Sequence, residues 1–379
     1  MNILIAVTIL SKSNGGVCTH VIDLCRELVK QNHNVYLLTD NDDNDYLVQI
    51  NELQNIKLGG EFCFYPMPLH DIPLKSYFKT ASQIKKIVKK YNIDIMHVHG
   101  QALCVLAELV KIKTFGKVPF VWTNHIDAIH KPEQFKKILK LFRFPIISVS
   151  TDLKEMMVNE YGVAEKRVFV VCNGTDVEKY VPFSDDERQK LRLERHWCDK
   201  YVIALLARIS DVKGHKYLLE AVNKIQKENK ISDIKVVFAG QVFGGYKGYL
   251  LGLEKYAAEN CIDLEFLGFQ NPKDVFGLAN LAVLPSIFEG FPLTVLEAIA
   301  MHCPVIRSDT PGYKDTKDFN LVFPKKDIEK LSELLIYAYY NQSEMKQMAA
   351  HGRETVLKKF TIEKQVKNTL KVYEDIIDK

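Results

Sequence analysis

Short runs of apolar, often β-branched residues alternate with longer segments of helical periodicity along the whole chain. This alternation is typical of α/β proteins with parallel sheets. In the first half it predicts strands at residues 2–7, 34–39, 62–66, 94–99, 118–123, 145–149 and 168–171. Amphipathic helices are expected between them, as at residues 17–31, where one face carries Val17, Val21, Leu24, Cys25 and Leu28.

The pattern pauses after residue 172 and then resumes. Asn173-Gly-Thr-Asp176 leads into a polar, proline-containing stretch at residues 180–187, which suits a linker between domains. Further strands are expected at residues 201–207, 235–239, 263–267, 281–285, 305–308 and 321–323, before closing helices at 328–341 and 361–378.

These patterns predict an α/β protein with two Rossmann-like, doubly wound domains that face a central cleft. A chain of 379 residues is also too long for one ordinary core. We expect one domain at residues 1–178, a second at 179–358, and a C-terminal helix within 359–379 that packs back on the first. Open α/β sheets bind ligands outside the carboxyl ends of their strands, so residues that follow strands are the candidates for chemistry.

Composition and charge narrow the class of protein. With 47% hydrophobic and 26% charged residues, a soluble globular protein is expected. The start, Met1-Asn-Ile-Leu-Ile-Ala-Val7, lacks a basic region, and no apolar run approaches about 20 residues, so neither a signal peptide nor a membrane span is predicted. The eight cysteines show no CxxC and no zinc spacing, which favours the reducing cytoplasm.

Two loops that follow first strands carry phosphate-binding features. Gly15 and Gly16 lie between the first strand and its helix, where glycines let the backbone approach a phosphate and the helix supplies free N–H groups. Their spacing is not GxGxxG, which weighs against a dehydrogenase. Arg208 and Lys213 follow the first strand of the second half and could neutralise a diphosphate without a metal. A tight turn and an exposed charged loop explain these residues equally well when each is taken alone.

The segment Glu289-Gly-Phe-Pro-Leu-Thr-Val-Leu-Glu297 predicts an anion-binding corner between a strand and a helix. Pro292 fits a first helical turn, and the free amides of that turn would face an anion. Glu289 and Glu297 suit sugar and ribose hydroxyls, because carboxylates accept hydrogen bonds strongly. Complementing the helix dipole explains Glu289, but it does not explain Glu297 inside an otherwise apolar helix.

Histidines follow two strands of the first half, in His97-Val-His-Gly100 and Thr123-Asn-His125-Ile-Asp127. His125 could donate a hydrogen bond to a substrate hydroxyl or carbonyl. A lone histidine is more often structural, but two histidine-bearing strand ends on one edge favour a site. Asp40-Asn-Asp-Asp-Asn-Asp45 contains two DxD triplets, which resemble a metal–diphosphate motif and half of a calcium loop. The calcium loop would need Gly at its sixth position and Glu at its twelfth, where Asn51 stands, so we favour a solvated loop and expect no metal.

Together these residues resemble the retaining glycosyltransferases of family four (glycosyltransferase group 1), which have the two-Rossmann GT-B fold. The likeness covers nearly the whole chain, and its most specific element is the Glu-x7-Glu motif inside SIFEGFPLTVLEAIAMHCPVIRSDTPG. The Arg208/Lys213 pair, the Gly15-Gly16 loop, His125, NGTD at 173–176 and FLGF at 266–269 also match. Gln241-Val-Phe-Gly-Gly245 departs from the family pattern, so base recognition there stays open.

The resemblance implies an acceptor-binding first domain, a nucleotide-sugar-binding second domain and transfer without a metal or other cofactor. Catalytic residues would be His125, Arg208, Lys213 and Glu289. The donor would be bound by Gly15, Gly16, Arg208, Lys213, Gly268, Phe269, Glu289, Gly290, Phe291, Pro292, Leu293, Thr294 and Glu297. Retention would proceed by same-face attack, with the departing phosphate oxygen accepting the acceptor's proton.

The expected reaction is transfer of a hexose or N-acetylhexosamine (EC class 2.4) from a nucleotide sugar to a lipid-linked glycan acceptor of a surface polysaccharide, such as O-antigen lipopolysaccharide or capsule. The sequence Glu289-Gly-Phe-Pro292 favours a UDP-sugar as the donor. Basic amphipathic helices at residues 75–92 and 131–144 suit the inner membrane surface, although a solvated helix face explains them too. A non-hydrolysing epimerase, a non-catalytic copy of the fold and a small soluble acceptor remain alternatives, and no nucleic-acid module is recognisable.

Overall fold

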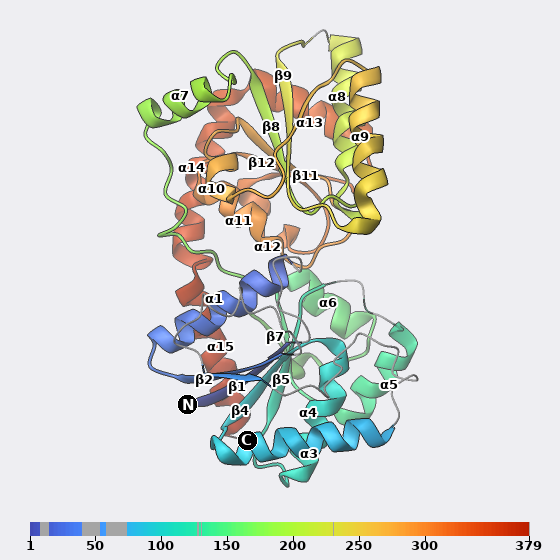
Figure 1. The fold of residues 1–379 in the computed structure, drawn as a ribbon, viewed down its shortest axis with the longest axis vertical. Coiled ribbons are helices and arrows are strands. Elements are labelled where there is room, and N and C mark those ends of the chain that lie inside the picture. Colours follow the sequence, from blue (N-terminus) through green and yellow to red (C-terminus); the bar gives the residue numbers. More distant parts are fainter. Residues whose placement is uncertain are drawn as a thin grey trace. The chain divides into compact units, whose positions relative to one another are not determined.

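The computed structural model describes residues 1–7, 15–39, 54–57, 74–126, 129, 131–229 and 231–378. The strand expected at residues 62–66, the acidic loop at 40–45, and Ser13 and Asn14 of the glycine segment lie outside these ranges. The chain forms two compact units, shown in Figure 1. Unit 1 comprises Met1–Asn173 with Ile362–Lys379, and unit 2 comprises Gly174–Thr361, so the borders fall a few residues from those expected after 178 and 358.

Unit 1 is built on a parallel sheet with the strand order β3-β2-β1-β4-β5-β6-β7. The strands are β1 (Asn2–Val7), β2 (Asn34–Thr39), β3 (Gln54–Lys57), β4 (Ile95–His99), β5 (Phe120–Asn124), β6 (Ile146–Ser148) and β7 (Val168–Val170). Except for β3, these strands were predicted from the sequence. The segment Gln-Asn-Ile-Lys of β3 has no apolar run that would have indicated a strand.

Helices cover both faces of this sheet. Described helices of unit 1 are α1 (Gly16–Lys30), α3 (Leu74–Lys90), α4 (Gln101–Lys113), α5 (Pro132–Phe142), α6 (Thr151–Asn159) and α15 (Ile362–Ile377). Alternate side chains of β1 enter two different cores: Leu4 packs in the cluster with α3 and α4, whereas Ile5 packs in the cluster with α1 and α15. The last helix, α15, is therefore part of unit 1 and lies beside α1 (Figure 1).

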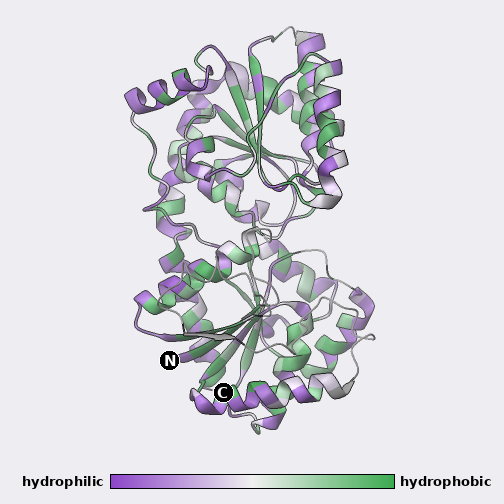
Figure 2. Ribbon diagram, viewed as in Figure 1, coloured by the Kyte–Doolittle hydropathy of each residue, from purple (hydrophilic) through white to green (hydrophobic). Residues whose placement is uncertain are grey.

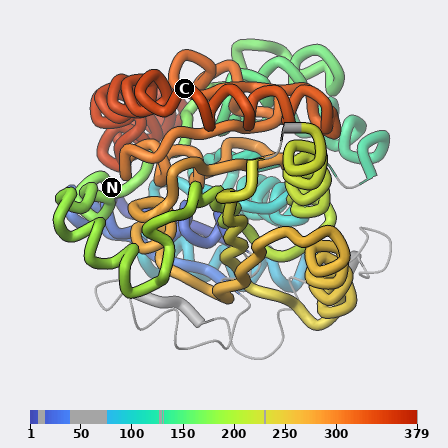
Figure 3. The backbone as a smooth tube through the Cα atoms, turned by 90° about the horizontal axis from the view of Figure 1, so that it is seen from above, coloured from blue at the N-terminus to red at the C-terminus, as the bar shows by residue number. Residues whose placement is uncertain are grey.

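Unit 2 repeats this design with the strand order β10-β9-β8-β11-β12-β13, again parallel. The strands are β8 (Tyr201–Leu206), β9 (Ile234–Ala239), β10 (Asp263–Phe266), β11 (Leu281–Leu284), β12 (Val305–Ser308) and β13 (Leu321–Phe323). Its described helices are α7 (Asp185–Glu194), α8 (His215–Asn229), α9 (Lys247–Glu259), α10 (Pro272–Phe276), α11 (Leu293–Ala300), α12 (Tyr313–Thr316), α13 (Ile328–Tyr340) and α14 (Gln342–Lys359). Figure 3 shows α8 and α9 side by side, in agreement with their contacts.

Both sheets are thus doubly wound, and the prediction of two Rossmann-like domains is confirmed. The strand order reverses between β1 and β4 in unit 1 and between β8 and β11 in unit 2. Such switch points, outside the carboxyl ends of the strands, are where open α/β sheets bind ligands. Figure 2 shows mainly hydrophobic strands beneath helices of mixed character. Among the described helices, none has the length and apolar character needed to cross a membrane.

Candidate active site

At the switch point of unit 2, the loop after β8 packs tightly on the loop after β11. The first loop turns through a 3₁₀ segment, Asp211–Lys213, into Gly214 with φ of 75°. A Cβ on Gly214 would lie 2.0 Å from the Pro285 carbonyl oxygen, so the close approach needs glycine. The Ile287 N–H donates to the Val212 carbonyl over 2.8 Å and ties the two loops together.

This packing brings Lys213 and Glu289 into direct contact. The Lys213 Nζ lies 2.6 Å from Glu289 Oε1, and both side chains are largely buried, at 19% and 10% exposure. A buried charge needs a partner of opposite sign, and each of these two residues supplies it for the other. The structure therefore joins two of the residues that the sequence singled out separately.

Arg208 lies in the same loop, directly after β8 and Ala207, and its side chain is exposed. Within the part of the chain that the structure describes, no ion pair involves it. A guanidinium in that position can bind an incoming diphosphate without first breaking an ion pair.

The Glu289–Glu297 segment forms the predicted corner. Pro292 is the N-cap of α11, one position before the first helical turn, and no side chain caps the helix. The first amides of α11 are consequently left without a capping side chain and can donate to an anion. Phe291 is buried, with its ring 5.7 Å from that of Phe360, so the backbone of the corner is held in place from behind.

Glu297 is buried within α11 at 6% exposure, although every other described helix position from Val295 to Ala300 is apolar. Its Oε1 accepts a hydrogen bond from the Tyr180 hydroxyl over 3.1 Å. Tyr180 was not anticipated, because it belongs to the stretch interpreted as a linker.

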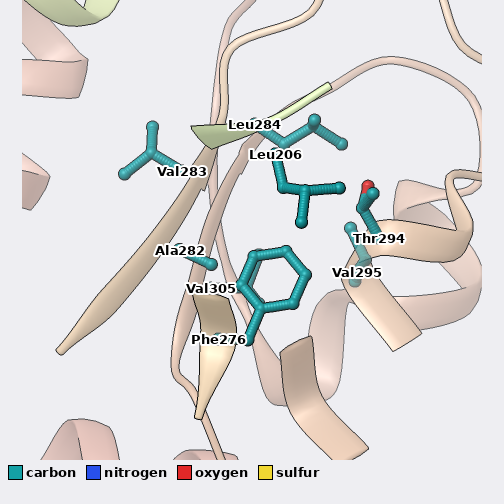
Figure 4. A pocket seen from close by; sticks show the side chains of 8 residues that line it. All are labelled: Leu206, Phe276, Ala282, Val283, Leu284, Thr294, Val295 and Val305. Atoms are coloured by element: carbon teal, nitrogen blue, oxygen red, sulfur yellow. The ribbon is translucent and has the colours of Figure 1, made fainter. Parts of the chain in front are cut away.

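Figure 4 shows a small apolar cavity beside α11. Its walls include Leu206, Leu284, Thr294 and Val295, and none of the charged residues of the corner lines it.

The loop after β10 carries the two residues expected beside the base. Gly268 has φ of 67° and its carbonyl accepts from the Gly240 N–H over 2.7 Å. Phe269, next to it, is 66% exposed, which leaves an aromatic face for stacking. The Ile209 N–H donates to the Gln241 carbonyl over 3.0 Å, so the segment that departs from the family pattern adjoins the Arg208 loop.

The remaining predicted residues lie in unit 1. Gly15 is the N-cap of α1 with φ of 59°, a conformation that favours glycine, and a Cβ on Gly16 would meet nothing within 4 Å. His125 follows β5 and is half-buried. Its Nε2 lies 2.8 Å from Nδ1 of His99, at the end of β4, so the two histidine-bearing strand ends do meet.

A third histidine, His20 of α1, joins this pair, with its ring centroid 4.6 Å from that of His125. His20 was not predicted from the sequence as a site residue. The available signal was a histidine on the apolar face of α1, next to Val21. Behind the pair, the His97 ring nitrogens lie 2.6 Å from the Tyr373 hydroxyl and 2.5 Å from Thr123 Oγ1.

Burial keeps these imidazoles neutral. Loss of hydration lowers the pKa of His20 to about 4, despite an opposing hydrogen bond with Asn173. The pKa values of His99 and His125 also lie well below 6.5. Burial is the largest cause, and the neighbouring histidines add to it. At neutral pH each ring therefore offers one N–H and one lone pair rather than a positive charge.

Two doubly wound sheets, with a Glu-x7-Glu corner and an Arg/Lys loop at the switch point of the second, define a glycosyltransferase of the GT-B fold. Residues 186–355 match the model of the glycosyl transferases group 1, and residues 14–179 match that of Glycosyltransferase Family 4. The chain belongs to glycosyltransferase family four.

Individual relatives share about a quarter of their residues with this chain, or fewer. The chain is 26% identical over 335 residues to the UDP-Gal:alpha-D-GlcNAc-diphosphoundecaprenol alpha-1,3-galactosyltransferase of Escherichia coli, covering 83% of this chain and 84% of that enzyme. A glycosyltransferase structure from Rickettsia africae matches with a TM-score of 0.84 and 19% identity, covering 99% and 98% of the two chains. Anabaena Alr3699/HepE in complex with UDP-glucose matches with a TM-score of 0.76 and 17% identity, covering 97% and 99%.

Proposed function

We propose that this glycosyltransferase transfers a hexose or N-acetylhexosamine, with retention of configuration, from a UDP-sugar to a lipid-linked acceptor in surface polysaccharide synthesis. The observation that carries the donor site is the Lys213–Glu289 contact at the switch point of unit 2, beside the uncapped N-terminus of α11. Cation, carboxylate and free amides are the groups that a sugar diphosphate requires.

Within the proposed site each group has a separate task. Arg208 and Lys213 neutralise the diphosphate, so that no metal is needed for this step. The backbone from Gly290 to Thr294 binds the distal phosphate and sugar, and Glu289 accepts hydrogen bonds from sugar hydroxyls. Glu297 binds the ribose, with Gly268 and Phe269 beside the base. In unit 1, Gly15 and Gly16 approach the phosphates and neutral His125 donates to a sugar hydroxyl.

The reaction follows from where charge develops. As the sugar–phosphate bond breaks, the diphosphate gains negative charge and the sugar gains positive character. The acceptor hydroxyl attacks from the face that the phosphate leaves, and the departing phosphate oxygen takes its proton. Catalysis then comes from positioning and from fixed dipoles and cations, rather than from a side-chain nucleophile.

Two relatives support a uridine donor. The Escherichia coli relative uses UDP-Gal, and Anabaena HepE has been crystallised with UDP-glucose. The same Escherichia coli enzyme acts on a diphosphoundecaprenol-linked sugar, which favours a lipid-linked acceptor here.

A basic and apolar surface of unit 1 supports the lipid-linked acceptor. Helix α3 carries Lys79, Lys86, Lys89 and Lys90 on exposed positions. On the same helix Phe78 is 49% exposed, while Ile112 of α4 is 57% exposed and Phe115, after α4, is 90% exposed. The Lys113 Nζ lies 5.7 Å from the Phe78 ring centroid, which joins α3 to α4. Lysines next to exposed apolar side chains suit an anionic bilayer surface.

A donor panel tests this proposal. The purified chain is incubated with UDP- and GDP-sugars, with and without a chelator, in the presence of either an undecaprenyl-diphosphate sugar or free sugars. The proposal expects transfer from one UDP-sugar to the lipid-linked acceptor at a rate that the chelator does not reduce. Epimerisation of the donor without transfer, or transfer to free sugars alone, would overturn it.

A further inference from the structure

His20, His99 and His125 come from three elements, α1 and the ends of β4 and β5, and converge on one point. Each offers one ring nitrogen, and the three nitrogens all lie within 4.8 Å of one another. The ring centroids are separated by 4.6 Å for His20–His125, 5.1 Å for His99–His125 and 5.3 Å for His20–His99. We propose that these three histidines bind one divalent transition-metal ion of the zinc class.

To bind such an ion, the three ligand nitrogens have to shift by up to about 1.5 Å from their present spacing of at most 4.8 Å. Zinc–nitrogen bonds of about 2.0–2.1 Å in a tetrahedral arrangement place ligand nitrogens about 3.3 Å apart. Imidazole is the ligand that zinc, copper and nickel share, whereas magnesium and calcium prefer oxygen. Three protein ligands leave the fourth position open to water or another oxygen ligand.

A polar partner outside the cluster orients His20 as a ligand. His20 Nδ1 lies 2.9 Å from Asn173 Oδ1, and an amide oxygen can only accept, so Nδ1 carries the proton and Nε2 keeps its lone pair. The 3.3 Å contact of Gln365 Nε2 with the same nitrogen fits this tautomer when the Gln365 amide is turned so that its oxygen faces the ring. Such a partner behind the ring is the usual support of a metal-binding histidine.

Two buried nitrogens of the cluster lack a hydrogen-bond partner. His20 Nε2, the nitrogen that would bind the ion, is buried and unsatisfied, which is costly unless something else binds there; His99 Nε2 is also unsatisfied but is not the ligand nitrogen of its ring. The depressed pKa values noted above mean that the rings are already neutral, so a metal ion need not displace a proton into solvent.

One proton has to move within the cluster. His99 Nδ1 and His125 Nε2 now share a hydrogen bond, so one of them is an N–H. For both to bind the metal, that proton moves to the other nitrogen of the same ring, and the two ligand nitrogens separate by about 0.5 Å to reach zinc geometry. His97, whose ring centroid lies 4.2 Å from that of His99, is anchored by Tyr373 and supports His99 during this change.

Metal binding would also occupy a nitrogen of His125 that the proposed transfer uses. Zinc should therefore slow transfer, in keeping with chemistry that needs no metal. This consequence rests on the proposed function, whereas the binding itself does not.

The test uses the full chain, dialysed against a chelator and titrated with Co²⁺ while visible absorption is recorded, with Zn²⁺ as competitor. We expect one equivalent per chain, with the spectrum of a tetrahedral site. His20→Gln and His125→Gln should weaken binding at least tenfold, and Asn173→Ala, behind the ligand, about 10–100-fold. His351→Gln, at an exposed position of α14, is the matched control and should bind as the wild type does.

Circular dichroism and the melting temperature show which variants are folded. Half-buried His125 is the ligand most tolerant of replacement, so His125→Gln decides if His20→Gln fails to fold. The proposal is overturned if the wild type binds no stoichiometric Co²⁺, or if folded His125→Gln binds it with wild-type affinity. The three histidines would then form a hydrogen-bonded cluster only.

Discussion

Lys213 and Glu289 are 76 residues apart in sequence, yet their charged atoms lie 2.6 Å apart in the structure. This contact holds Lys213 at the switch point of unit 2, in the same loop as exposed Arg208. If these cations stabilise charge on the leaving diphosphate, each contributes to the transition state more than to the ground state.

We expect Arg208→Ala and Lys213→Ala each to lower kcat by roughly 10²–10³, by analogy with the loss of one oxyanion-hole donor. Steady-state kinetics with the preferred donor measures this loss. Lys216→Ala, one helical turn away with a side chain 60% exposed, is the control and should keep wild-type kinetics. Near-wild-type turnover in both Arg208→Ala and Lys213→Ala would refute the assignment.

At the scale of elements, the site depends on how closely two loops approach. A Cβ on Gly214 would lie 2.0 Å from the Pro285 carbonyl oxygen, and its φ of 75° is strained for other residues. We expect Gly214→Ala to destabilise unit 2 by about 1–3 kcal/mol and to reduce transfer, because the loop that holds Lys213 has to move.

Thermal unfolding and donor kinetics measure both effects. Gly248→Ala is the control, since a Cβ there meets nothing within 4 Å and alanine favours the helix α9. A Gly214→Ala protein with the melting temperature and transfer rate of the wild type would show that the close packing of these loops is dispensable.

The elements differ in how far the sequence could predict them. Strands such as β1 and β8 are buried on both faces, so their apolar runs were readable without any tertiary information. Helix α14 was not predicted, because its buried positions include Ala349 and Gly352, which give a weak apolar stripe.

The candidate site shows the same division. Arg208, Lys213 and the corner could be found because they directly follow strands, where sheet topology dictates the position of a ligand. His20 and Tyr180 could not be found in that way. His20 contacts His125, and Tyr180 donates a hydrogen bond to Glu297. Both contacts depend on packing between segments that are far apart in sequence.

At the scale of the whole molecule, stability should depend on a histidine outside the proposed metal site. His215 of unit 2 is fully buried, and burial lowers its pKa to about 3, although the hydrogen bond that its ring donates to the Ser210 carbonyl opposes the shift. Between its unfolded value of about 6.5 and pH 3, the unfolded chain binds a proton that the folded chain excludes. Stability is therefore lost as pH falls below about 6.5.

We expect the wild type to lose about 1.4 kcal/mol more stability per pH unit than His215→Gln between pH 6 and 4. Urea unfolding in a Trp122→Phe background measures this, because Trp197 of unit 2 is then the remaining tryptophan and reports on that unit. His351→Gln serves as the exposed control. Parallel pH profiles of the wild type and His215→Gln would contradict the prediction.

We propose that a UDP-sugar bound at the Lys213–Glu289 corner is the source of a sugar transferred to a lipid-linked acceptor. The most direct measurement is incorporation of labelled sugar from UDP-sugars into an organic-extractable undecaprenyl product, compared between the wild type, Lys213→Ala and Lys216→Ala. We expect incorporation with retained configuration by the wild type and Lys216→Ala, and a loss of roughly 10²–10³ in Lys213→Ala. No incorporation from any UDP-sugar by the wild type, or equal incorporation by Lys213→Ala, would contradict it.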